Sequence, residues 1–411
     1  MRAYFRLETG ETIVRRLVPR WQIAIAFAVS VVALAPRASA EAWNQTVLYR
    51  FAGGSDGAYP YDELIQDGAG NLFGTTFGGG AMCAKNHGCG TVFKLAPDGT
   101  ETVLYAFRGG EDGGEPRAGL VEDQDGNLYG TTTLLHGTVF KLTQGGAHTV
   151  LHTFAGKDGT EPIAGLISDQ AGNLYGTAAS GGDLHCYCGT VFRITPAGVF
   201  SVLYAFHGAS DGNGPQGALV ADSSGNLYGT TYLGGDVACN ANRGCGTVFK
   251  LTPDGQKSVL HAFHGGQDGM FPFSALIFDA AGDLYGTTGF GGGTGCDGLG
   301  CGSVFKLAPD GAETILARFE FPGAPTFPHA GVIMDDKGNL FGTGPWGGVG
   351  GCGGVFRVAV GKGAKTIHSF TCRGKGRNPG GGVLRERGGL LVGTTIGGGN
   401  LHGTVFALQR R

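Results

Sequence analysis

Three short strings recur seven times along the chain, each time with a fourth apolar segment. The strings read GNLYGTT, GTVFKL and TVLYAF or close variants, and the fourth segment reads AGLVED or similar. All four are rich in β-branched and aromatic residues and are bounded by Gly, Pro, Asn and Asp, which is typical of short strands joined by tight turns. None keeps the 3.6-residue period of a helix. A regular tandem unit of this kind constrains the fold more than any bulk property.

Each unit therefore contains four strands, which we name A (AGLVED), B (GNLYGTT), C (GTVFKL) and D (TVLYAF), from the inside outward. Four strands per unit in seven copies predict an all-β fold, a seven-bladed β-propeller of four-stranded antiparallel blades. Strand D is apolar at both alternating sets of positions. We therefore expect it to be buried on both faces.

The order of the strands predicts how the ring closes. The first segment after the leader, residues 46–51, is a D strand, and the last segment, residues 403–408, is a C strand. The last blade lacks an outer strand unless the first segment supplies it. We predict that the N-terminal strand pairs with the last blade, because this closure removes exposed sheet edges.

The first 40 residues differ from the repeats. Three arginines, Arg15, Arg16 and Arg20, precede an apolar run over residues 21–35, which ends in the small-residue string of residues 38–40. This pattern predicts a secretory signal peptide over residues 1–40 and a single propeller domain over residues 41–411. The alternative is a membrane anchor, although fifteen apolar residues are few for a span. We expect an exported protein, periplasmic or extracellular, with no membrane span after cleavage.

The repeats resemble a known family. Strings of the form D-x-x-G-N-L-Y-G-T-T, G-T-V-F-K-L-T-P-D-G and T-V-L-Y-A-F are similar to the tandem GloVer repeats of bacterial choice-of-anchor proteins. The resemblance covers nearly all of the chain after residue 40. It implies export and a propeller-like repeat fold and implies no established activity. The chain lacks a C-terminal sorting tail, which leaves surface anchoring unsupported.

Charge and composition exclude several function classes. The net charge is −3, so the basic surplus that nucleic-acid binding needs is missing. The 82 glycines come with only 16 prolines and no three-residue period, which excludes collagen. We expect a monomer that needs no cofactor.

An exported chain with ten cysteines favours disulfides over metal sites. We predict four local pairs in the loops between strands B and C and a fifth pair that spans one blade: Cys83 with Cys89, Cys186 with Cys188, Cys239 with Cys245, Cys296 with Cys301, and Cys352 with Cys372. The alternative for one loop is a metal site of His185, Cys186 and Cys188. We expect disulfides there and no metal site in the chain.

The antiparallel order also predicts two unlike faces. The B–C and D–A loops emerge on one face and vary between repeats, whereas uniform short turns occupy the other, so function is expected on the variable face. Its candidate ligand-binding residues are loop aspartates and aromatic residues, namely Asp56, Asp112, Asp158, Asp211, Asp268, Tyr187, Tyr232, Phe290 and Trp346. The alternative, purely structural interpretation is that the aspartates shape turns and the aromatic residues cover the cores of the loops.

No catalytic residue is predicted, because the sequence contains no G-x-S-x-G, H-E-x-x-H, P-loop or S-x-x-K string. The leading hypothesis is a secreted, non-enzymatic binding module whose disulfide-bearing loop face holds an extracellular glycan or protein. The rival is a carbohydrate-active enzyme, a lyase or hydrolase, with carboxylates at the central channel. Such carboxylates come from separate blades and leave no local spacing. A structural envelope protein is the third possibility.

Overall fold

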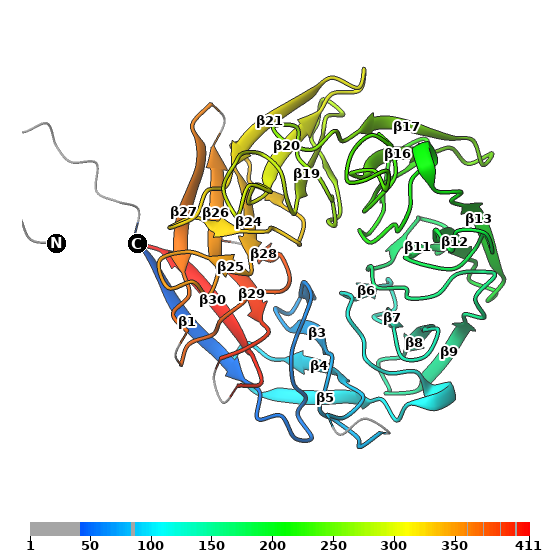
Figure 1. Cartoon of the computed structure of the whole chain (residues 1–411). Helices are drawn as coiled ribbons and strands as arrows, with labels where there is room; N and C mark the ends of the chain where they lie inside the picture. Colours follow the sequence, from blue (N-terminus) through cyan, green and yellow to red (C-terminus); the bar gives the residue numbers. More distant parts are fainter. Residues whose placement is uncertain (1–41, 84–86, 360, 373, 387, 399–400) are drawn as a thin grey trace, which may run out of the picture. The chain divides into compact units, whose positions relative to one another are not determined.

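The computed structural model describes residues 42–83, 87–359, 361–372, 374–386, 388–398 and 401–411. The predicted signal peptide lies outside these residues. From Trp43 onward the chain forms seven four-stranded antiparallel sheets arranged in a ring, which confirms the predicted seven-bladed β-propeller (Figure 1). Among the described residues, no helix is long and apolar enough to cross a membrane.

The blades follow one another along the chain, and in each blade the inner strand is named first and the outer strand last. Blade 1 comprises β2 (Ile65–Gln66), β3 (Leu72–Thr76), β4 (Thr91–Leu95) and β5 (Glu101–Ala106). Blades 2 and 3 comprise β6 (Val121–Glu122), β7 (Leu128–Thr132), β8 (Thr138–Leu142) and β9 (His148–Thr153), then β10 (Ile167–Ser168), β11 (Leu174–Ala178), β12 (Thr190–Ile194) and β13 (Phe200–Ala205). Blades 4 and 5 comprise β14 (Val220–Ala221), β15 (Leu227–Thr231), β16 (Thr247–Leu251) and β17 (Lys257–Ala262), then β18 (Ile277–Phe278), β19 (Leu284–Thr288), β20 (Ser303–Leu307) and β21 (Glu313–Arg318).

Blade 6 comprises β23 (Ile333–Met334), β24 (Leu340–Gly344), β26 (Gly354–Ala359) and β27 (Gly363–Ser369). Beside it, β22 (Pro325–Thr326) and β25 (Trp346–Gly347) form a separate two-stranded sheet. Blade 7 comprises β28 (Val383–Arg385), β29 (Leu391–Thr395), β30 (Thr404–Arg410) and β1 (Trp43–Arg50). Two single-turn 3-10 helices, η1 (Gly110–Asp112) and η2 (Ala209–Asp211), lie in D–A loops.

The predicted closure is confirmed, because the first strand completes the last blade. β1 pairs antiparallel with β30, with Trp43 opposite Arg410 and Arg50 opposite Thr404. Figure 1 shows the blue and red strands side by side at the point where the ring closes. The Trp43 ring also packs edge-on against Phe341 of blade 6, with ring centroids 6.3 Å apart. The N-terminal strand thus contacts two blades.

The expectation for strand D was wrong in one respect. Every pair of strands C and D has a shift of register. In blade 1, Val92 lies opposite Tyr105 and Phe93 lies opposite Val103, so Leu104 of β5 is an extra residue between them. This β-bulge interrupts the strict two-residue alternation and bends the strand. As the outermost strand, β5 has no fully buried residue. Burial on both faces belongs to strands B and C, such as β3 and β4.

The core is a ring of contacts between neighbouring blades. A phenylalanine that follows each strand D packs against a phenylalanine of strand C in the next blade, as Phe107 does on Phe140 with ring centroids 5.2 Å apart. The same pairing occurs at all seven junctions: Phe51 with Phe93, Phe107 with Phe140, Phe154 with Phe192, Phe206 with Phe249, Phe263 with Phe305, Phe319 with Phe356, and Phe370 with Phe406. Edge-to-face packing of buried rings stabilises the junctions beyond the area they bury.

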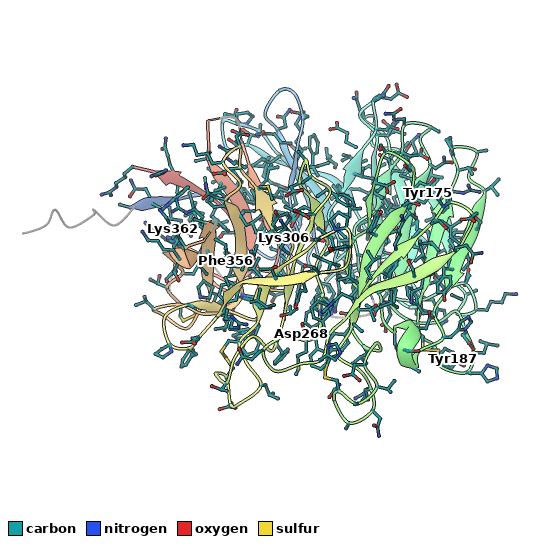
Figure 2. The ribbon with its side chains drawn as sticks, turned by 90° about the horizontal axis from the view of Figure 1, so that it is seen from above. Tyr175, Tyr187, Asp268, Lys306, Phe356 and Lys362 are labelled. Carbon is teal, nitrogen blue, oxygen red and sulfur yellow. A yellow bond between two sulfur atoms is a disulfide. The ribbon has the colours of Figure 1, made fainter. Side chains whose placement is uncertain are left out.

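The two faces differ as the strand order predicts. The B–C and D–A loops meet, as in the bridge between Ala58 and Gly78 of blade 1. The A–B and C–D turns meet at the opposite face, where a side chain at Gly70 would contact Pro97. Figure 2 shows Tyr187 and Asp268 toward the loop face and Tyr175 toward the turn face.

Candidate functional site

The central channel holds a cavity of about 410 Å³, which is walled by residues that precede or begin strand A in all seven blades. Pro345 and Ile396, which follow strand B in blades 6 and 7, also line it. Because strand B runs toward the loop face, these two residues place the mouth of the cavity on the face that carries the disulfides. A cavity of this size lies within the range of small-molecule sites, ~300–1,000 Å³.

Two carboxyl groups stand out on the wall of this cavity. In six blades, the two residues before the apolar start of strand A are Gly, Ala or Ser, which leaves the channel open. Blade 1 instead carries Asp62 and Glu63 at this position, whereas the other blades carry Ala118–Gly119, Ala164–Gly165, Gly217–Ala218, Ser274–Ala275, Ala330–Gly331 and Gly381–Gly382. One blade of the ring thus places an acid pair where the others place small side chains.

Asp62 is held firmly in position. Its carboxylate accepts hydrogen bonds from two backbone amides, Gly119 N at 2.7 Å in blade 2 and Glu63 N at 2.8 Å. Its backbone carbonyl accepts a hydrogen bond from the Thr394 hydroxyl of blade 7, at 3.1 Å. Withdrawal from bulk water raises the pKa of the Asp62 carboxyl, and the two amide hydrogen bonds oppose that rise. Asp62 therefore joins blades 7, 1 and 2 at the channel.

Glu63 sits in a different environment. Its side chain occupies space left by glycine, because a Cβ on Gly382 would come within 2.0 Å of Glu63 Oε1. Burial in the channel, with the neighbouring Asp62 charge as the second cause, raises the pKa of Glu63 to about 7. Among the residues that the structure describes, none donates a hydrogen bond to its carboxylate. Glu63 is half-buried and lines the wall of the cavity. Near neutral pH this group both gives and accepts a proton, as a general acid or base must.

Donors and aromatic rings surround the mouth above the acid pair. The residue before this two-residue position varies between blades. It supplies to the cavity wall Tyr61, Arg117, Gln216, Phe273 and His329. The Arg117 guanidinium lies over the Tyr61 ring, 5.7 Å from its centroid. Burial by the channel walls lowers the pKa of His329, so its ring is neutral at pH 7. The mouth thus combines acceptors, donors and flat apolar surfaces within one cavity.

The predicted loop aspartates are not brought together. Each one bonds instead to the end of its own strand D, as Asp211 does by accepting from His207 N at 2.8 Å and from the Tyr204 hydroxyl at 2.8 Å. None of them lines the channel cavity. The same backbone hydrogen bond recurs at Asp56, Asp112, Asp158 and Asp268. These contacts fit the turn-shaping interpretation.

The predicted aromatic residues fall into two groups. Tyr187 and Trp346 are more than half exposed on the loop face, at 55% and 53%. Tyr232 stacks on Phe273, with ring centroids 4.8 Å apart, and thereby supports the wall of the channel mouth. Phe290 packs against other loop rings, including Phe271.

The five predicted disulfides are confirmed. The bonds join Cys83 with Cys89, Cys186 with Cys188, Cys239 with Cys245, Cys296 with Cys301, and Cys352 with Cys372. The two thiols that the alternative metal site with His185 would use are thus bonded to each other. Four of the bonds staple B–C loops around the face on which the channel opens.

Sequence reasoning missed Asp62 and Glu63, although a signal was present. Alignment of the seven A strands shows small residues at these two positions in six copies and two acids in the first. Tandem copies serve as internal references for one another, so a departure in a single blade marks a special position. The prediction instead favoured the aspartates that recur in several blades.

Seven blades around a central channel make this chain a β-propeller repeat protein. It belongs to the Gloeobacter/Verrucomicrobia repeat family, whose model matches residues 37–183, 83–299 and 237–411. No curated protein matches the chain.

Two solved structures are similar to the whole ring. Virginiamycin B lyase from Staphylococcus aureus is 14% identical with a TM-score of 0.59, and the match covers 90% of this chain and 99% of that one. The extracellular domain of a putative hybrid two component system from B. thetaiotaomicron is 10% identical with a TM-score of 0.57, and the match covers 89% of this chain and 39% of that one. At these identities the likeness shows the fold alone.

Proposed function

We propose that the protein is an exported binding module, periplasmic or extracellular, that holds a hydroxyl-rich ligand such as a glycan at the channel mouth on its disulfide-bearing loop face. The observation that carries this proposal is the acid pair Asp62 and Glu63, which a single blade places in the cavity. Asp62 also joins blades through its hydrogen bonds, but the Glu63 carboxyl is desolvated without a donor among the described residues, a cost that a purely structural role does not offset. Five disulfides are in keeping with an oxidising compartment.

The chemistry of the wall favours sugar hydroxyls. Carboxylate oxygens of Asp62 and Glu63 accept hydrogen bonds from vicinal hydroxyls, and Arg117 and Gln216 donate to ring and hydroxyl oxygens. The rings of Tyr61 and Phe273, which line the cavity, offer apolar surface for the C–H side of a sugar ring. Such a mixture of few polar groups and aromatic walls is typical of small-ligand sites.

The test is a glycan array on the folded, oxidised protein, followed by calorimetric titration of the best ligand. We expect Asp62→Asn/Glu63→Gln to weaken binding at least about tenfold, because two charge-assisted hydrogen bonds become neutral ones. Asp254→Asn, in an exposed turn on the opposite face, is the matched control and should bind like the wild type. An array and a protein pull-down that both stay blank, or a double variant that binds like the wild type, would remove the channel as the binding site.

The second candidate function is a lyase or hydrolase that acts on the same ligand. It is favoured by one observation, the raised pKa of Glu63 beside a fixed, differently solvated Asp62. Two carboxyls with unlike environments are the usual arrangement for acid and base roles. The bound glycan is therefore followed for release of reducing ends or unsaturated products. Turnover that Glu63→Gln abolishes while binding persists identifies the enzyme, and binding without turnover identifies the binding module.

A further inference from the structure

A second set of polar groups lies at the outer edge of the ring, far along the chain from the channel residues. At several junctions between blades, three side chains meet: a ring residue of strand D, the aspartate of the following D–A loop, and the first residue of strand D in the next blade. At the junction of blades 3 and 4 these are Tyr204, Asp211 and Lys257. At the junction of blades 4 and 5 they are His261 of β17, Asp268 and Glu313 of β21.

The junction of blades 4 and 5 brings three metal-ligand atoms together. His261 Nε2 lies 3.2 Å from Asp268 Oδ1 and 3.9 Å from Glu313 Oε2. One ligand atom from each residue lies within 4.8 Å of the other two. We propose that His261, Asp268 and Glu313 bind a divalent transition-metal ion such as Zn²⁺, which ties blade 4 to blade 5.

The distances suit such an ion. Nitrogen and oxygen ligands lie ~2.0–2.2 Å from zinc, so two ligands at a tetrahedral angle are about 3.3 Å apart. The two distances from His261 bracket this value. A neutral imidazole with two carboxylates is also a ligand set that zinc and related ions accept. Three protein ligands leave one position for water, as in open zinc sites.

The neighbouring junction fills the same position with a cation of the protein itself. There the ammonium of Lys257 lies 2.8 Å from Asp211 Oδ1, so the protein supplies its own cation between the two outer strands. In the next blade the lysine is replaced by Glu313 and the tyrosine by His261. Compared with its neighbour, this junction therefore has no lysine ammonium and one more carboxylate. Its ring residue, His261, is of a type that binds metals.

A second observation points to the same place. Glu313 Oε1 is buried and has no hydrogen-bond partner among the described residues. A buried carboxylate oxygen without a partner is costly, and an added cation removes that cost. The other charged or titratable groups at this edge are His264, whose Nδ1 lies 3.2 Å from Asp268 Oδ2, and Arg318 of β21.

The sequence could not show this site, because its members come from two blades and leave no motif. The proposal therefore departs from the expectation that no metal binds. It is independent of the channel and of any ligand there.

The test uses the full-length protein in its oxidised, metal-stripped form, in which no free thiol competes for zinc. Zn²⁺ is added, the protein is passed through a desalting column, and bound zinc is measured by mass spectrometry and by competition with a chromophoric chelator. We expect one equivalent of zinc per chain. Calcium in tenfold excess should not displace it, since calcium prefers an all-oxygen site.

Two variants make the result specific. His261→Tyr/Glu313→Lys gives this junction the residues of its neighbour, so it should fold and hold less than a fifth of an equivalent of zinc. Asp211→Asn at the neighbouring junction is the matched control and should keep one equivalent. Glu313→Gln should weaken zinc binding at least about tenfold.

Three outcomes overturn the proposal. The first is a wild type that retains no zinc, and the second is a folded double variant that retains as much zinc as the wild type. The third is zinc binding that is lost in a variant of the exposed, unrelated pair His185 and His207 and kept in the double variant.

Discussion

At the scale of single residues, the channel shows how position decides chemistry. Asp62 and Glu63 are neighbours in the chain, yet two backbone amides bond to Asp62 and, among the described residues, none donates to the Glu63 carboxylate. Burial and the Asp62 charge raise the pKa of Glu63 from its ordinary 4.5 to about 7. The folded protein therefore keeps a proton that the unfolded chain has released between these two values. The contribution of Glu63 to the free energy of unfolding therefore falls as pH rises from about 4.5 to 7 and is level above that.

Replacement of Glu63 by Gln removes this loss of stability with rising pH. We expect Glu63→Gln to be more stable relative to the wild type at pH 8 than at pH 5, by up to about 3 kcal/mol. Urea unfolding of both proteins at the two pH values measures the difference. The control is Glu111→Gln in an exposed loop, which should show no such dependence on pH. An equal wild-type-to-variant difference at both pH values contradicts the raised pKa.

At the scale of strands, a buried hydroxyl pair links strands B and C in most blades. In blade 4 the hydroxyls of Thr231 and Thr247 lie 2.8 Å apart, and Thr231 donates to the Leu233 carbonyl at 2.9 Å. Thr231→Val leaves the Thr247 hydroxyl buried without its partner, which we expect to lower the free energy of unfolding by about 1–2 kcal/mol. Thr231→Val/Thr247→Val should cost less than the sum of the single changes. Chemical denaturation measures all three, with the exposed Thr102→Val of β5 as the control.

The positions of the strands could be predicted from the sequence, but their local irregularities could not. Apolar runs between turn-forming residues predicted the strands, because the same pattern recurs in all seven repeats. The bulge at Leu104 was invisible, since one extra residue leaves no mark in composition. So was the left-handed residue before the proline of each D–A loop, such as Phe271 with φ of 59° before Pro272. Residues before proline ordinarily favour extended conformations, and here the surrounding loop overrides that preference.

At the scale of the whole molecule, the fold could be predicted from the sequence more fully than the candidate sites could. Strand order alone predicted that the ring closes through β1, because order is a property of the sequence read along its length. The channel pair and the His261 junction depend on contacts between blades, which distance in the chain conceals. A comparison of each blade with its six copies brings out the channel pair before the structure is known, whereas the His261 junction needs the contacts between two blades.

The closure itself gives the last prediction. β1 completes blade 7 over its full length, its Trp43 packs on Phe341 of blade 6, and Phe51 packs on Phe93 of blade 1. Deletion of residues 41–52 therefore removes an outer strand, exposes the edge of β30 and unpairs one of the seven phenylalanine junctions. We expect this deletion to lower the melting temperature far more than removal of Ala241 and Asn242, which lie in an exposed loop of blade 4. Scanning calorimetry measures the melting temperatures of the two variants. The effect of the strand deletion should be large because every blade of a ring depends on both of its neighbours. An unchanged melting temperature in the strand deletion would mean that the other blades stand without closure.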